Sequence, residues 1–155
     1  MTEPEQSAYR AICGQLNWIC SQSRPDVSFD ICQLCTKLSS ATIKDVKRAS
    51  KVLKKVKQDN VFIIFRKLDP PIKLLAFCDA SYGNLDNGYS QGGMIIFLSD
   101  KNNKVVPIAW SAKNIKKVCR STLTAETMIL TDTIDICAWL SHILNEVVDT
   151  ELGTT

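Results

Sequence analysis

Two acidic residues, Asp79 and Glu126, have surroundings in which a carboxylate could do chemistry. Asp79 follows the apolar run Leu74-Leu75-Ala76-Phe77-Cys78 and precedes a loop that contains Gly83. A charged carboxylate after an apolar strand is costly unless it is paired, hydrogen-bonded or bound to a metal. The simpler alternative is that Asp79 only forms an Asx-turn. For Glu126, near the start of a predicted helix, the simpler alternative is a favourable position in the helix dipole.

These two carboxylates can cooperate only across space. At about 100° per residue, Asp132 and Asp135 lie roughly 120° and 180° around the helix from Glu126, so neither pairs with it. We expect Asp79 and Glu126 to meet if the helix packs on the strand face that carries Leu75 and Phe77. Two carboxylates beside phosphate-binding residues suit Mg²⁺, which uses few protein ligands plus phosphate oxygens. A site for two metal ions needs more acids than these two.

Positive charge is concentrated in two stretches of the chain. Residues 42–67 contain nine lysines and arginines against two aspartates, and residues 101–125 contain six basic residues and no acid. Such clusters are expected where a protein contacts a phosphate backbone, although a single cluster is more often a solvated helix face. The candidate nucleic-acid-binding residues are Lys47, Lys51, Lys54, Lys113, Lys116, Lys117 and Arg120.

Composition excludes several other classes. The 155 residues are 45% hydrophobic and 23% charged, which suits one folded domain, or one domain with an appendage. The single histidine, His142, argues against a Ser–His–Asp hydrolase and a multi-histidine metal site. The net charge of +3 is too small to name a partner. No apolar run approaches the roughly 20 residues of a membrane span, so we expect no membrane contact.

Cysteine usage indicates an intracellular protein. Seven cysteines, an odd number, occur without an apolar leader segment, which favours reduced thiols. Cys32 and Cys35 have CxxC spacing, but no second pair completes a zinc site. Their position inside a helical pattern favours packing in a core over metal or redox chemistry.

The elements that must position these residues follow from periodicity. The spacing of apolar residues predicts helices over 7–22, from Pro25 to about Ser39, and over 42–58, the last with Thr42 and Asp45 as a capping box. A final helix of about 25 residues is expected to begin at Ser121 or Thr122 and to end near Val147.

Between these helices the period changes to that of strands. We expect strands over 61–66, 72–79, 94–99 and 105–111, the second of them buried on both faces. Breaks are expected at Asp69-Pro70-Pro71, at Asn87-Gly88 and over residues 100–103. Short connections between the last three strands predict an antiparallel meander.

Motifs in this order resemble the C-terminal part of the Pol polyprotein of copia-type retrotransposons. Residues 9–35, YRAICGQLNWICSQSRPDVSFDICQLC, resemble the segment after the reverse-transcriptase core, and the lysine-rich helix resembles the next segment of that polyprotein. FCDASYGN at 77–84 resembles the first strand and acid of the family's ribonuclease H domain. YSQGGMIIFL, PIAWSAK and RSTLTAE resemble its next strands and helix start. Together these motifs cover nearly the whole chain.

The resemblance implies a mixed α/β (α+β) fold and a Mg²⁺-dependent nuclease that cuts the RNA strand of RNA–DNA hybrids, with Mn²⁺ as a substitute. N-terminal helices (1–60) would precede a partial ribonuclease H-like domain (61–148), a three-stranded meander with a long packing helix, and a truncated tail (149–155). Asp79 matches the family's first catalytic acid and metal ligand, and Glu126 the helix-borne one. The family's third and fourth acids lie beyond Thr155, and Asp149 and Glu151 are not replacements. Thr124 and Thr127 depart from the acidic and aromatic residues of many relatives.

We therefore expect weak or no hybrid cleavage by this chain alone. Two other functions stay open: a non-catalytic nucleic-acid-binding remnant, and a scaffold that binds a protein partner. The expected partners are an RNA–DNA hybrid or other nucleic acid and the remainder of the Pol polyprotein. The expected location is the cytoplasm, the nucleus or a virus-like particle.

Overall fold

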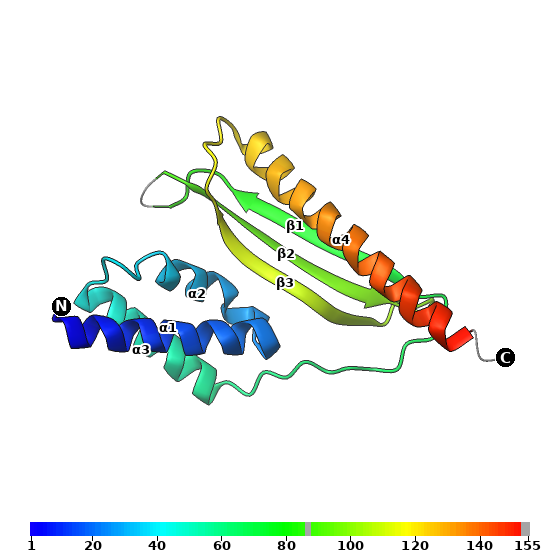
Figure 1. Ribbon diagram of the computed structural model, residues 1–155, viewed down its shortest axis with the longest axis horizontal. Coiled ribbons are helices and arrows are strands. Elements are labelled where there is room, and N and C mark those ends of the chain that lie inside the picture. The colour runs from blue at the N-terminus through cyan, green and yellow to red at the C-terminus, as the bar shows by residue number, and fades with distance from the viewer. Residues whose placement is uncertain (86–87, 153–155) are drawn as a thin grey trace. The chain divides into compact units, whose positions relative to one another are not determined.

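The computed structural model describes residues 1–85 and 88–152 (Figure 1). Its elements, in chain order, are α1 (Glu3–Ser23), the 3₁₀ turn η1 (Pro25–Val27), α2 (Ser28–Cys35), α3 (Ile43–Gln58), β1 (Lys73–Ser81), β2 (Ser90–Ser99), β3 (Val105–Ile115) and α4 (Thr122–Leu152). The strands form one sheet in the order β1-β2-β3. The predicted mixed fold, with helices first and then a three-stranded antiparallel meander and a long helix, is confirmed.

The chain divides into two compact units. The first holds residues 1–64 with residues 110–113, and the second holds residues 65–109 and those from 114 onward. Helices α1, α2 and α3 make up most of the first unit, here called the helical unit. The sheet and α4 make up most of the second, here called the sheet unit.

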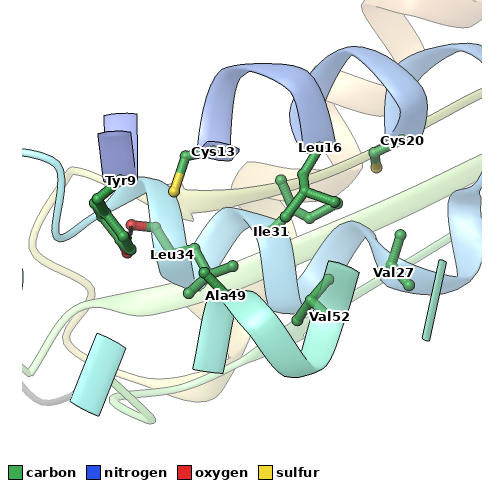
Figure 2. Packing of buried hydrophobic residues seen from close by; sticks show 9 residues of the cluster. All are labelled: Tyr9, Cys13, Leu16, Cys20, Val27, Ile31, Leu34, Ala49 and Val52. Carbon is green, nitrogen blue, oxygen red and sulfur yellow. Dashed lines mark hydrogen bonds between the residues drawn. The ribbon is translucent and has the colours of Figure 1, made fainter. Parts of the chain in front are cut away.

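The core of the helical unit is built from one apolar stripe on each helix (Figure 2). Its buried residues are Tyr9, Cys13, Leu16, Cys20, Val27, Ile31, Leu34, Ala49 and Val52. The hydroxyl of Tyr9 donates a hydrogen bond to the carbonyl oxygen of Leu34 at 2.9 Å, so this polar group is satisfied inside the core. The helix predicted over 42–58 is confirmed as α3, and the backbone N–H of Thr42 donates to Asp45 Oδ2 at 2.8 Å in the predicted capping box.

The predicted strand over 61–66 is wrong, because residues 59–69 have no regular secondary structure. Phe62 is 78% exposed and Phe65 is 74% exposed. Apolar and β-branched residues favour a strand only where a neighbouring strand completes its hydrogen bonds. Within the described residues, segment 61–66 pairs with neither edge of the sheet, which consists of β1, β2 and β3 in that order.

Strands β1 and β2 pair in an antiparallel register that runs from Lys73 opposite Ser99 to Ser81 opposite Gln91. Strand β1 was expected to be buried on both faces, and this is wrong: Phe77 is 57% exposed. Phe77 instead contacts Phe97 edge to face, with ring centroids 6.2 Å apart. Only the alternate face of β1, with Cys78 and Ala80, packs in the hydrophobic cluster of the sheet unit.

Helix α4 covers that alternate face, mainly over β1 and less over β2 (Figure 1). Ala125 and Ile129 of α4 join Ala80 and Cys78 in the cluster. The expectation that the helix packs on the Leu75 and Phe77 face is therefore wrong. The reason is size, because the Ala80 face also carries Gly92 on β2, and small residues let a helix approach a sheet closely.

Helix α4 is longer than expected and longer than strand β1. It has 31 residues and continues to Leu152 instead of ending near Val147. At 1.5 Å per residue it extends about 46 Å, whereas a nine-residue strand extends about 30 Å. Trp139, 62% exposed, lies in its second half. Over Thr122–Val147 this helix is long and apolar enough to cross a membrane, by length and composition only, and 11% of the most apolar window is buried. A single helix of this kind is weak evidence for a membrane span.

The hairpin expected over residues 100–103 is present and is held by Asp100, which is 1% exposed. Its carboxylate accepts hydrogen bonds from the backbone N–H groups of Asn102, Lys104 and Asp69 at 2.8, 2.9 and 3.2 Å. Although burial favours the neutral acid, these donors hold the pKa of Asp100 below its ordinary value. Of the turn expected at Asn87-Gly88, Asn87 lies outside the described residues and Gly88 has a φ of 74°.

Candidate functional site

Asp79 lies on β1, two residues before the end of the strand, and is exposed. Its Oδ1 accepts a hydrogen bond from the backbone N–H of Ala80 at 2.9 Å. Because side chains alternate along a strand, Asp79 projects from the face opposite to Ala80 and α4. An exposed carboxylate does not carry the desolvation cost that the apolar run before it suggested. It is open to a ligand from solvent.

Glu126 is exposed near the start of α4, directly after Ala125, which is 0% exposed. The predicted cap at Ser121 is confirmed, since its Oγ accepts a hydrogen bond from the backbone N–H of Thr124 at 3.2 Å. The flanking loop carries Lys116 and Lys117. The start of α4 thus combines an exposed carboxylate with nearby positive charge.

The topology brings the two acids to the same end of the sheet. Asp79 is near the carboxyl end of β1, and the meander returns β3 to that end before α4 begins. Ala80 and Ala125, the direct neighbours of the two acids in sequence, belong to one hydrophobic cluster. Because α4 covers the edge strand β1, the carboxylates would have to approach one another around the free edge or the end of that strand.

The described residues contain no group of three or more acids, cysteines or histidines arranged to hold a metal ion. Asp79 and Glu126 could together supply only part of the oxygen shell that Mg²⁺ requires. The remaining oxygens would have to come from water, from phosphate or from acids outside this set. The described residues therefore do not by themselves show a divalent-cation site at Asp79 and Glu126.

Helix α3 presents a continuous basic stripe, defined here as Lys44, Lys47, Lys51, Lys54 and Lys55. All five are exposed, and at 3.6 residues per turn they fall within about 100° of the helix circumference. The stripe lies opposite the buried side of α3, so the same amphipathic pattern that builds the core aligns the charges. The structure therefore brings the predicted residues Lys47, Lys51 and Lys54 onto one surface.

The second predicted basic group lies on β3 and the loop that follows it. Lys113, near the end of β3, is exposed, as are Lys116, Lys117 and Arg120 in the loop before α4. These side chains follow the chain from the sheet to the start of the helix that carries Glu126. They place positive charge at the end of the sheet where α4 begins.

None of the seven cysteines, all of which lie in the described residues, forms a disulfide. Cys13 and Cys20 are buried in the helical unit, and burial raises the pKa of each of these thiols. Burial likewise raises the pKa of Cys35. A buried thiol of raised pKa is a poor nucleophile and metal ligand, which fits a packing role for Cys13 and Cys20. Of the CxxC pair, both half-buried, Cys35 packs against this core, and Cys32 is not part of it.

Two further residues matter for the site, although sequence patterns alone did not single them out. Gly92 lies opposite Ala80 in the sheet, against Ile129 of α4. Its sequence signal was a pair of glycines inside an apolar strand pattern, which can mark a close approach of another element. Arg24, within the Arg-Pro-Asp motif, is 5% exposed and holds the end of α3, which carries the basic stripe.

Comparison with known proteins found relatives among transposon polyproteins. The chain is 29% identical over 147 residues to the retrovirus-related Pol polyprotein from transposon RE1 of Arabidopsis thaliana, and 29% identical over 144 residues to that from transposon RE2. These matches cover 94% and 92% of this chain but 10% of each polyprotein. A putative transposon Ty5-1 protein of Saccharomyces cerevisiae is 28% identical over 111 residues, which cover 71% of this chain and 34% of that protein.

No family model matches the chain, and no solved structure matches it at a significant level. The chain thus spans about a tenth of the length of the plant polyproteins that it matches. The resemblance to retrotransposon Pol polyproteins that the sequence motifs predicted is confirmed by these relatives.

Proposed function

We propose that the sheet unit is part of a ribonuclease H-like nuclease within a retrotransposon Pol polyprotein. In this proposal Asp79 and Glu126 bind Mg²⁺, or Mn²⁺ in its place, at the backbone of an RNA–DNA hybrid. The observation that carries the proposal is that Ala80 and Ala125, the neighbours of the two acids, pack in one cluster at one end of the sheet. This packing supports the proposal through backbone positions only, since Asp79 projects from the face opposite to α4.

The two carboxylates would act as metal ligands, because exposed ionised oxygens are what a hard divalent cation prefers. A bound cation of this kind activates water and neutralises charge on a phosphate during hydrolysis. Two acids supply fewer ligands than a pair of ions about 4 Å apart requires. We therefore propose that these residues alone bind the cation weakly and cut slowly.

The basic residues would hold the nucleic acid. The stripe on α3 and the side chains at Lys113, Lys116, Lys117 and Arg120 offer charge without base-reading geometry. Contacts of this kind neutralise phosphates and fix position, and they depend on helix shape more than on sequence. Recognition of a hybrid would then rest on its backbone geometry.

A non-catalytic nucleic-acid-binding module is the second candidate. It is favoured by the absence of a cluster of three metal-ligating side chains among the described residues. A protein-binding scaffold has a different observation in its favour, the exposed Phe77 beside Phe97 on the face of β1 opposite to α4. Nucleic-acid binding that falls steeply with salt distinguishes the nucleic-acid-binding module from the protein-binding scaffold.

A chimera tests the nuclease directly. A segment that carries the third and fourth acids implied by the family resemblance would be fused after Thr155. We expect the unfused chain to cut an RNA–DNA hybrid poorly and the chimera to cut it in a Mg²⁺-dependent reaction that Asp79→Asn abolishes. Asp135→Asn, on another side of α4, is the matched control. A folded chimera that is inactive, or whose cutting survives Asp79→Asn, would refute the proposal.

A further inference from the structure

Gly92 lies where the sheet and α4 come closest. A methyl group added at this glycine would lie 2.9 Å from Cδ1, 3.0 Å from Cγ1 and 3.1 Å from Cβ of Ile129. Carbon atoms in good contact are about 3.5 to 4.0 Å apart. Ile129 is 1% exposed, so its side chain has no open space to enter. A side chain at position 92 therefore has no room at the present spacing of helix and sheet.

Ile129 cannot relieve this contact by rotation alone. A β-branched side chain in a helix has one strongly preferred χ1 rotamer, and its Cβ is fixed to the helix backbone. The distance of 3.1 Å to Ile129 Cβ thus measures backbone separation. To reach an ordinary contact, α4 would have to move from β2 by about half an ångström.

This contact is one residue from Asp79 in the register and three residues from Glu126 in α4, although Asp79 projects from the other face of the sheet. Gly92 is opposite Ala80 in the register, and Asp79 is opposite Gly93, one residue further along. Ile129 follows Glu126 by three residues, which is less than one helical turn or about 4.5 Å along the axis. A displacement of α4 at Ile129 is therefore transmitted to Glu126, while Asp79 stays with the sheet.

We infer that Gly92 is a positioning residue: the missing side chain sets the spacing between α4 and the sheet and thereby the placement of Glu126 relative to Asp79. The inference rests on the proposed function, since the placement matters only if the two acids share a cation. Mg²⁺ requires oxygen ligands near 2.1 Å in octahedral geometry, whereas Ca²⁺ accepts longer and more variable distances. An altered spacing should therefore weaken Mg²⁺ more than Ca²⁺.

The spacing itself is tested by thermal unfolding of the full chain. Gly92→Ala should lower the midpoint by several degrees, and Ile129→Ala should lower it through a cavity. In the double variant the two losses should be less than additive, because Ile129→Ala removes two of the three close carbon atoms. Gly14→Ala, which meets nothing within 4 Å, is the control and should not lower the midpoint. Additive losses, or an unchanged midpoint in Gly92→Ala, would overturn the spacing claim.

The positioning role is tested at a temperature where circular dichroism shows each variant folded. Mn²⁺ binding is followed by electron paramagnetic resonance, with Mg²⁺ and Ca²⁺ as competitors. We expect Gly92→Ala to raise the Mg²⁺ concentration that displaces half of the bound Mn²⁺ by about tenfold. The corresponding Ca²⁺ concentration should rise less, and the double variant should recover part of the Mg²⁺ binding. Unchanged Mg²⁺ competition despite the shifted midpoint would refute the positioning role. If the wild-type chain binds no Mn²⁺ through Asp79 and Glu126, the proposed function fails and the positioning role with it, whereas the spacing result is independent.

Discussion

Arg24 shows how a single side chain in the Arg-Pro-Asp motif joins distant elements. Its Nε and Nη2 donate to the Asp26 carboxylate at 2.8 and 2.9 Å. Its Nη1 donates to the carbonyl oxygens of Val56 and Asp59 at 2.9 and 3.2 Å. Carbonyls at the end of a helix lack intrahelical donors, so a cation there is doubly favourable. The motif is thus structural: it fixes the end of α3 against the start of η1.

We predict that Arg24→Ala lowers the unfolding free energy of the helical unit by about 2 to 3 kcal/mol, because it leaves the Asp26 carboxylate and two carbonyls without their donor. Urea denaturation followed by circular dichroism measures this change. Arg48→Ala is the control, since its pair with Asp30 at 3.2 Å is exposed and should contribute less than about 0.5 kcal/mol. Equal effects of the two substitutions would contradict the structural role of the motif.

The same pair predicts a pH dependence. The Arg24 hydrogen bonds hold the pKa of Asp26 below its ordinary value, which is about 3.9 in an unfolded chain. A lowered carboxyl pKa contributes stability that is present above the unfolded pKa and is lost as pH falls through the folded pKa. We expect the helical unit to lose stability below about pH 4, and Asp26→Asn to flatten this loss. Acid titrations that superimpose for the two proteins would refute the assignment.

At the scale of elements, local patterns predicted the helices better than the strands. Helix α3 was predicted almost to the residue because its capping box and its opposed apolar and basic faces are all local signals. The segment 61–66 was mistaken for a strand because strand formation depends on a partner that no local pattern reveals. The face of β1 that α4 covers was also missed, since both faces carry apolar residues. The deciding feature, Gly92, lies on another strand.

Segment 61–65 is largely exposed, and its contribution to stability can be measured. Since Phe62 is 78% exposed, we expect Phe62→Ser to change the unfolding free energy by less than about 0.5 kcal/mol. For comparison, Ile129→Ala removes a buried side chain and should cost about 2 to 5 kcal/mol. Chemical denaturation of both variants measures the difference. A cost for Phe62→Ser above about 2 kcal/mol would mean that the segment is packed after all.

The basic stripe on α3 gives a prediction about binding. We expect Lys47→Gln, Lys51→Gln and Lys54→Gln together to weaken hybrid binding. The slope of the logarithm of the binding constant against the logarithm of salt concentration should become shallower by about one for each phosphate that is no longer neutralised. Fluorescence anisotropy at several salt concentrations measures both quantities. Replacement of Arg66, Lys67 and Lys101 by Gln removes the same charge elsewhere and serves as the control. If both triple variants bind with the same reduced affinity, net charge explains the binding and the stripe does not.

At the scale of the whole molecule, two separate hydrophobic cores predict separate stabilities. The helical unit and the sheet unit each have their own buried cluster. We expect Leu16→Ala to speed amide hydrogen exchange in α1, α2 and α3, and Ile129→Ala to speed it in β1, β2 and α4. If the unfolding free energy of a unit falls by about 3 kcal/mol, the hydrogen-exchange protection of its amides should fall roughly a hundredfold. Equal acceleration of both units by either variant would show a single cooperative structure.

The most direct measurement of the central claim is Mn²⁺ binding to the intact chain. We expect wild type to bind Mn²⁺ at a site that Asp79→Asn and Glu126→Gln each weaken by about tenfold or more. The double variant should bind Mn²⁺ more weakly than either single variant, because the carboxylate that remains in each single variant still contributes to the site. Asp135→Asn should bind like wild type. An affinity unchanged by either single substitution would contradict the claim that these two carboxylates hold one cation.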